Sequence, residues 1–164
     1  MGMIMWELTT GCKPFVNVAH DLDLIFEILD GKRPEITEDT PECFANLMKS
    51  CWDPDPKKRP SMTEISKTLN SWSNNRNTKS MERIQFNQAD KKRLELIKLN
   101  KLIPQVSHPV AAYTSRPLSF FISKCSSINS FSKGMYKKFD LDFFFSNKYI
   151  KHIIFRLYFN RIRS

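Results

Sequence analysis

The stretch CWDPDPKKRPS at residues 51–61 holds two structural signals close together. Proline disfavours a helical conformation in the residue before it, so Pro54 and Pro56 predict the end of a preceding helix. Ser61 and Glu64 form the pattern of a capping box, in which each side chain bonds the backbone N–H of the other residue. We therefore predict a helix before this stretch, a solvated turn within it, and a second helix starting at its end.

Apolar side chains at helical spacing extend this pattern on both sides and predict an all-α fold. The predicted helices span residues 1–10, 21–30, 41–52 and 61–72. Gly11 is typical of a helix C-terminus, and Thr40 is predicted to cap the third helix with Pro41 in its first turn. In the second helix, one apolar face is expected to hold Leu22, Ile25, Phe26 and Leu29.

The charge of the chain is unevenly distributed and separates a first module from a tail. Residues 1–72 carry 8 Lys and Arg against 12 Asp and Glu, whereas residues 73–164 carry 18 against 5. We expect a linker at 73–106 with a basic helix at 88–102, a Ser-rich disordered segment at 107–132, and a basic, aromatic-rich tail at 133–164.

The basic tail leaves three interpretations open. A solvated or disordered tail is favoured, while contact with an acidic membrane surface or with nucleic acid are the alternatives. No apolar run reaches the length of a membrane-spanning helix, and no basic region precedes the apolar start. We therefore expect no transmembrane segment, and a cytoplasmic or nuclear location.

Four ordered segments together resemble the C-terminal lobe of a protein kinase domain, from the helix called αF to the helix called αI, of the tyrosine-kinase-like type. They are GMIMWEL at 2–8, GCKPF at 11–15, ILDGKRP at 28–34, and the stretch at 51–61. The structural motif residues are Trp6, Glu7, Gly11, Pro14, Phe15, Trp52, Pro56, Arg59 and Pro60. The Ser-rich stretch from residue 113 also resembles tails of a large fungal kinase group.

The resemblance implies a signalling enzyme that, in its complete form, transfers a phosphoryl group from ATP with Mg²⁺ to protein Ser, Thr or Tyr. That reaction needs a Gly-rich loop, a Lys, and the H-R-D and D-F-G motifs. None occurs here, and the four glycines lie at 2, 11, 31 and 134. We therefore expect a truncated, pseudokinase-like fragment with no catalytic, cofactor-binding or metal-binding residue, and with ATP and Mg²⁺ belonging to the complete domain.

In the family, the Arg that matches Arg59 pairs with the Glu of an A-P-E motif, which this sequence lacks. Arg59 is therefore expected to find another acid or to face water. A lobe cut at its central helix would also expose Met1, Ile4, Met5 or Leu8 unless the tail or a partner covers them.

A non-catalytic interaction module is the main alternative function. The resemblance implies docking of protein partners or substrates on the αG-like face, for which the candidate residues are Asp23, Phe26, Lys32 and Arg33. A gene-model fragment without a role of its own is the third alternative. His20 is interpreted as a loop residue rather than an acid–base catalyst, and Cys43 and Cys51 as half-buried apolar residues rather than metal ligands.

Overall fold

A computed structural model describes residues 1–75, 77, 79–99, 101 and 106–114. Within these residues the fold is all-helical and holds no strand, as the sequence predicts. The elements are α1 (Gly2–Thr10), α2 (Leu22–Leu29), α3 (Glu42–Cys51), the short 3-10 helix η1 (Pro56–Lys58), α4 (Met62–Asn74) and α5 (Met81–Lys98).

Local capping signals define two of the helix ends where the sequence predicts them. Gly11 adopts a left-handed conformation with φ 70° and donates its N–H to the carbonyl of Glu7, which ends α1. At the start of α4, Ser61 accepts from the N–H of Glu64 while the Glu64 carboxylate accepts from the N–H of Ser61. These ends form through contacts within one turn, which is why the sequence reveals them.

One local prediction around α3 is corrected, and one short element is added. Pro41, rather than Thr40, is the N-cap of α3, because the Thr40 hydroxyl bonds the hydroxyl of Thr37 instead. The turn after α3 also contains the 3-10 helix η1, which the sequence analysis did not predict. The Asp55 carboxylate caps η1 by accepting from the N–H of Lys57.

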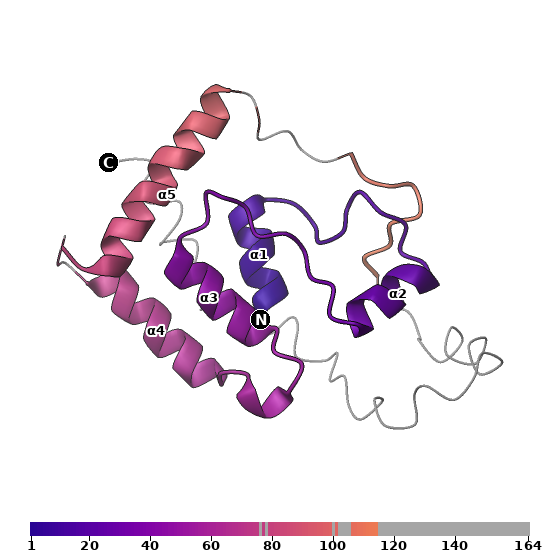
Figure 1. The fold of residues 1–164 in the computed structure, drawn as a ribbon, viewed down its shortest axis with the longest axis horizontal. Helices are drawn as coiled ribbons and strands as arrows, with labels where there is room; N and C mark the ends of the chain where they lie inside the picture. Colours follow the sequence, from indigo (N-terminus) through magenta and orange to yellow (C-terminus); the bar gives the residue numbers. More distant parts are fainter. Residues whose placement is uncertain (76, 78, 100, 102–105, 115–164) are drawn as a thin grey trace.

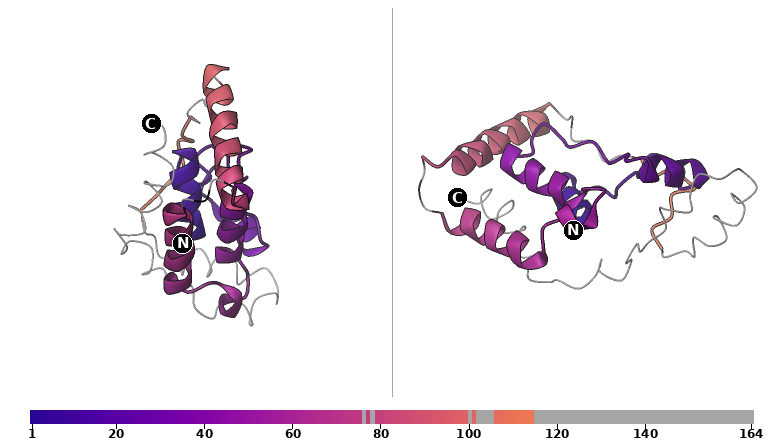
Figure 2. Two further views of the ribbon diagram at one scale, coloured as in Figure 1. Left: turned by 90° about the vertical axis from the view of Figure 1, so that its left-hand side faces the viewer. Right: turned by 60° about the horizontal axis from the view of Figure 1, so that its bottom comes forward.

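The buried side of α2 differs from the predicted face. Asp21 caps the helix by accepting from the N–H of Leu24, and Leu24 is its one buried residue. Phe26, expected on the inner face, is 41% exposed. Figures 1 and 2 show why: α2 lies apart from the other helices, at the far end from α4 and α5, and meets the body mainly through loops.

The hydrophobic core lies where α1 and α3 pack between α4 and α5 (Figures 1 and 2). Its buried residues come from all four of these helices. They are Met5, Trp6, Phe44, Met48, Ile65, Leu69 and Phe86. The expected exposure of α1 is therefore limited: Met5 is fully buried, and Met1 and Leu8 pack against this cluster.

The basic helix predicted at 88–102 is α5, which begins at Met81 rather than at residue 88 and ends at Lys98. Ser80 caps it by accepting from the N–H of Arg83. α5 contributes Phe86, 3% exposed, to the core, and the ring of Phe86 meets Trp72 of α4 edge-on at 6.0 Å. Part of the tail thus covers the apolar surface that α1 and α3 would otherwise present.

Residues 106–114 return to the loop that follows α1. The N–H of His108 donates to the carbonyl of Val16 at 2.7 Å, and these residues open the stretch predicted to be disordered. The remainder of that stretch and the aromatic-rich tail at 133–164 lie outside the described residues, so the predictions for them stay predictions.

Candidate functional site

The loop between α2 and α3 is held against α1 by a motif tryptophan. The indole N–H of Trp6 donates to the carbonyl of Glu35 at 2.7 Å. Trp52, the residue that follows α3, packs against the same core and is half-buried. Its Nε1 atom is buried and has no hydrogen-bond partner in the described part of the chain. Both rings therefore lie beside the segment that leads out of α2.

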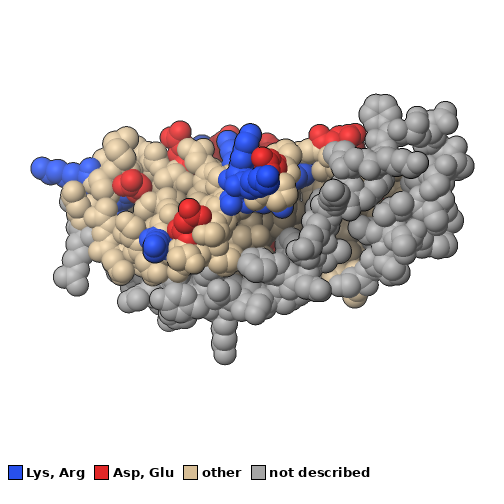
Figure 3. Space-filling view, turned by 90° about the horizontal axis from the view of Figure 1, so that it is seen from below, with Lys and Arg blue, Asp and Glu red and all other residues tan. Residues whose placement is uncertain are grey.

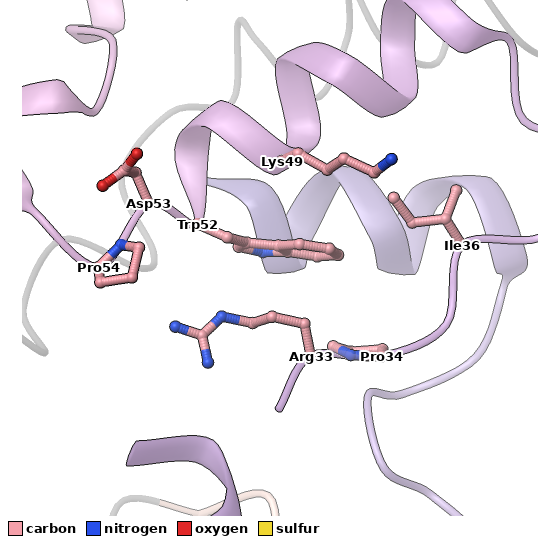
Figure 4. A pocket seen from close by; sticks show the side chains of 7 residues that line it. All are labelled: Arg33, Pro34, Ile36, Lys49, Trp52, Asp53 and Pro54. Atoms are coloured by element: carbon pink, nitrogen blue, oxygen red, sulfur yellow. The ribbon is translucent and has the colours of Figure 1, made fainter. Parts of the chain in front are cut away.

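A groove of about 560 Å³ opens between that segment and the end of α3 (Figure 4). Arg33, Pro34 and Ile36 line one side. The other side holds Lys49, Trp52, Asp53 and Pro54. We call it the Trp52 groove, because Figure 4 shows Arg33 and Lys49 on opposite sides of the Trp52 ring.

The Trp52 groove is bordered by positive charge. Burial lowers the pKa of the Arg33 guanidinium, and the nearby charge of Arg59 lowers this pKa further. Nη1 of Arg33 donates to the carbonyls of Ile28 and Lys32, at 2.9 and 2.8 Å. Among the described residues neither Arg33 nor Lys49 forms an ion pair. Figure 3, which views the side that carries η1, shows Lys and Arg side chains gathered near the middle of this face.

Arg59 faces water, which was one of the two outcomes expected for it. It is exposed, and its Nε donates to the carbonyl of Asp53 at 2.7 Å. A second bond, from Nη2 to the carbonyl of Pro54, is longer at 3.3 Å. Arg59 thereby holds the turn after α3 in place without an acidic partner in the described residues. Of the motif prolines, Pro56 opens η1 and Pro60 is half-buried before the capping box.

The four predicted docking residues divide between two surfaces. Asp23 and Phe26 are exposed on α2. Lys32, just beyond α2, pairs with Glu27, and both side chains are about half exposed. Arg33 turns into the Trp52 groove. We call the surface formed by Asp23, Phe26 and Lys32 the α2 face.

Of the residues that line the Trp52 groove, the sequence pointed only to Arg33, as a docking residue, and to Trp52, as a motif residue. The other lining residues were not predicted to belong to a site. Lys49 and Ile36 are separated along the chain and meet only in the folded molecule. A local signal existed only at Lys49. This residue lies in the last turn of α3, where the helix dipole favours a positive charge. That signal predicts a stabilised helix end and says nothing of a groove.

The motif residues after α1 form a tight turn. Glu7 pairs with Lys13 across the end of α1, beyond which Gly11 and half-buried Pro14 turn the chain. Phe15 has φ 56°, a conformation that costs energy for a residue with a side chain. Its carbonyl lies 3.1 Å from Nε2 of His20, which holds the turn closed.

His20 has a structural role in this geometry. Its Nδ1 lies 2.9 Å from the carbonyl of Ala112, and its ring meets Tyr113 edge-on at 4.9 Å. The imidazole thus connects the turn after α1 to the segment at 106–114, in keeping with a loop histidine.

The cysteines on α3 behave as half-buried apolar residues. Burial raises the pKa of Cys43 to about 11 and also raises that of Cys51. In the described part of the chain no group of three or more His, Cys, Asp or Glu is placed to hold a metal ion. Within the same residues no helix is both long and apolar enough to cross a bilayer.

Residues 1–69 match the family described as protein tyrosine and serine/threonine kinase. This agrees with the ordered segments at 2–8, 11–15, 28–34 and 51–61, and with the helices that connect them. The matched segment, less than half of this chain, is similar to part of a kinase domain.

Three relatives show how far the likeness extends. A protein described as a serine/threonine-protein kinase/receptor of Acanthamoeba polyphaga mimivirus is 43% identical over 68 residues, which are 42% of this chain and 4% of that protein. A LIM domain-containing serine/threonine-protein kinase of Dictyostelium discoideum is 37% identical over 68 residues, 10% of its length. Mitogen-activated protein kinase kinase kinase 7 of Homo sapiens is 36% identical over 69 residues, 11% of its length. No solved structure matches the chain significantly.

These coverages show that the likeness is confined to a small part of each relative. The chain spans between 4% and 11% of the length of these three relatives. The matched part of this chain ends before α5 begins.

Proposed function

We propose that residues 1–72 are the C-lobe part of a protein kinase acting in signalling, whose complete domain transfers the γ-phosphoryl group of ATP to protein. Support comes from the family match over residues 1–69 and from serine/threonine kinases as relatives. The finer assignment to tyrosine-kinase-like kinases of fungal type rests on sequence resemblance alone. The Ser/Thr relatives favour Ser or Thr over Tyr as the acceptor.

We further propose that the 164-residue polypeptide does not itself transfer phosphate. Phosphoryl transfer depends on positioned phosphate-binding and metal-binding groups, and the motifs that supply them do not occur in this sequence. The groove that the structure does show is lined by Trp52 and prolines, with Asp53 as its one acidic residue. A single carboxylate beside two cations is a poor Mg²⁺ site.

Thermal unfolding of the purified chain with and without Mg·ATP tests this point. A ligand at 100 times its Kd stabilises a protein by about 2.7 kcal/mol, which moves the Tm by several degrees. We expect no change in Tm and no transfer of labelled γ-phosphate to a general protein substrate. A rise in Tm at saturating Mg·ATP would overturn the proposal.

We infer, as a second proposal, that this segment provides a surface for protein partners. The observation that supports it is the exposed ring of Phe26. Phe26 is 41% exposed on a helix that lies apart from the other helices, so its ring is accessible to a partner. Aromatic residues dominate the energetics of protein interfaces when a partner covers them. Asp23 on the same helix and Lys32 beyond its end add charges of both signs at the rim of the α2 face.

Co-purification from extracts of the source organism tests the α2 face. The variants are Phe26→Ala and, as a matched control, Met81→Ala, which removes an exposed apolar side chain from α5 at the other end of the molecule. We expect partners captured by the wild-type chain to be lost with Phe26→Ala and kept with Met81→Ala. Equal capture by all three proteins would exclude the α2 face as the docking surface.

A further inference from the structure

Helix α5 is joined to the core by an apolar contact that is narrow for a helix of its length. Of its residues from Met81 to Lys98, Phe86 and Ala89 are buried. Other apolar side chains of this helix stand in solvent. They are Met81, Ile84, Leu94 and Ile97, which are between 37% and 67% exposed. Leu96 is half-buried, so the fully buried apolar contribution to docking rests on one aromatic ring and one methyl group.

A charged pair adds to this contact. Nε of Arg93 donates to Oδ2 of Asp39 at 2.6 Å, and Asp39 is 2% exposed. Nη2 of the same guanidinium donates to the carbonyl of Thr9, in the last turn of α1. Arg93 thus holds α5 to α1 and to the loop before α3 at once. The second carboxylate oxygen of Asp39 is buried without a hydrogen-bond partner in the described residues.

Two polar contacts along the helix fix its register. The side-chain oxygen of Gln85 accepts from the N–H of Cys43 at 2.8 Å, at the N-terminal end of α3. Lys92 forms an exposed ion pair with Glu38 at 3.2 Å. The N–H groups of the first turn of a helix have no partner within the helix, so Gln85 satisfies a donor that would otherwise need water.

We propose that α5 is a detachable latch: the end of α1, residues 38–43 and the start of α3 form a helix-docking surface, and its occupant is the chain's own α5, held by Asp39 and Arg93. This proposal concerns a helix beyond the kinase match and does not depend on the proposed function. A buried ion pair stabilises a contact weakly when intact, and removing one partner leaves an uncompensated buried charge. Such a pair therefore makes docking specific without making it strong.

The latch has a consequence for the wild-type chain. Regions held by few buried apolar contacts open before the whole protein unfolds. Under native conditions, the amides of α5 should exchange with deuterium through a local opening that leaves α3 and α4 protected. Equal protection in α5, α3 and α4 would show that α5 unfolds only with the whole molecule, and would overturn the proposal.

The cysteines of the full chain provide a second, site-resolved test. The backbone N–H of Cys43 bonds Gln85 of α5, whereas the other two described cysteines, Cys51 and Cys12, lie at the far end of α3 and after α1. Iodoacetamide modification is followed at each cysteine by mass spectrometry. We expect Arg93→Ala to raise the rate at Cys43 by about tenfold or more, with less than a twofold change at the other two.

Two further variants complete this test. Lys91→Ala removes an exposed cation from α5 and should leave the rate at Cys43 unchanged. Gln85→Ala removes the bond to the N–H of Cys43 and the longer bond to the Glu42 carboxylate, but leaves the Asp39–Arg93 pair intact. It should therefore raise the rate at Cys43 selectively and by less than Arg93→Ala does. An unchanged rate at Cys43 in both the Arg93 and Gln85 variants, or an equal rise at Cys12, Cys43 and Cys51 in both, would overturn the latch.

Discussion

The indole ring of Trp52 lies against Gly2 so closely that a Cβ atom on Gly2 would stand 2.3 Å from Nε1 of Trp52. The same Cβ would lie 2.9 Å from the backbone carbonyl of Met48. The ring could shift, but the carbonyl belongs to α3 and cannot move alone. The absence of a side chain at Gly2 therefore determines how near the start of α1 comes to the end of α3.

We expect Gly2→Ala to lower the free energy of unfolding. Replacing glycine by alanine in an open helix position stabilises by about 0.5–1 kcal/mol, whereas overpacking costs about 1–3 kcal/mol. At Gly2 the second effect should exceed the first, because one of the two close atoms is backbone. Urea unfolding of both proteins measures the difference.

A double-mutant cycle identifies the cause of that loss. In a Trp52→Leu background the large ring is gone, so Gly2→Ala should cost less than in the wild-type chain. Equal costs in both backgrounds would mean that Trp52 is not the group that excludes a side chain.

Helix ends could be predicted from the sequence because the groups that form them are neighbours along the chain. Gly11 needs only its own conformation and the carbonyl of Glu7, and Ser61 needs only Glu64. The kinase resemblance was recognisable for a similar reason, since each motif segment is short and continuous. The comparisons confirm that resemblance for residues 1–69.

Contacts between distant segments could not be predicted in the same way. The apolar spacing of α2 is compatible with several buried faces, and its separation from the other helices leaves Phe26 outside. α5 has no continuous apolar stripe, and Arg93 acts through Asp39, 54 positions away in the sequence. The Trp52 groove depends on how the two segments that line it meet. The buried face of α2, the contact of Arg93 with Asp39 and the Trp52 groove all depend on tertiary packing, which local propensity does not encode.

In the capping box of α4, Ser61 changes the pKa of the Glu64 carboxyl. Hydrogen bonds from the Ser61 hydroxyl and from the Ser61 backbone lower the pKa of Glu64 below its ordinary value of 4.5. The stabilisation from this box is therefore fully present above pH 4.5 and is lost as the pH falls through the lowered pKa. NMR titration of the Glu64 carboxyl carbon should show the lowered pKa in the wild-type chain.

Ser61→Ala is the control for that titration. It removes the hydroxyl bond, so the pKa of Glu64 should rise toward its ordinary value. Identical titration curves for the two proteins would show that the hydroxyl does not set the pKa.

Burial of the Cys43 thiol predicts slow alkylation and a loss of stability in alkali. Its pKa is raised from 9.0 to about 11, mainly by desolvation. The neutral thiol is the form that the folded chain favours, so this stabilisation is fully present below pH 9.0 and is lost as the pH rises through about 11. We expect Cys43→Ala to show a shallower fall of Tm between these two pH values than the wild-type chain. Parallel curves of Tm against pH for the two proteins would mean that ionisation of Cys43 does not cause the loss of stability in alkali.

The two apolar residues Phe86 and Leu94 of α5 should differ sharply in their effect on stability. Phe86 is 3% exposed and touches Trp72, whereas Leu94 is 50% exposed. Deleting a buried phenylalanine side chain costs about 3–5 kcal/mol, and an exposed substitution costs about 0.5 kcal/mol or less. If α5 opens locally, as the latch proposal requires, part of the cost of Phe86→Ala appears as opening of α5 rather than as global unfolding. Urea unfolding gives the global cost and hydrogen exchange in α5 gives the local one. Similar global costs for Phe86→Ala and Leu94→Ala, with unchanged exchange in α5, would show that Phe86 does not anchor this helix.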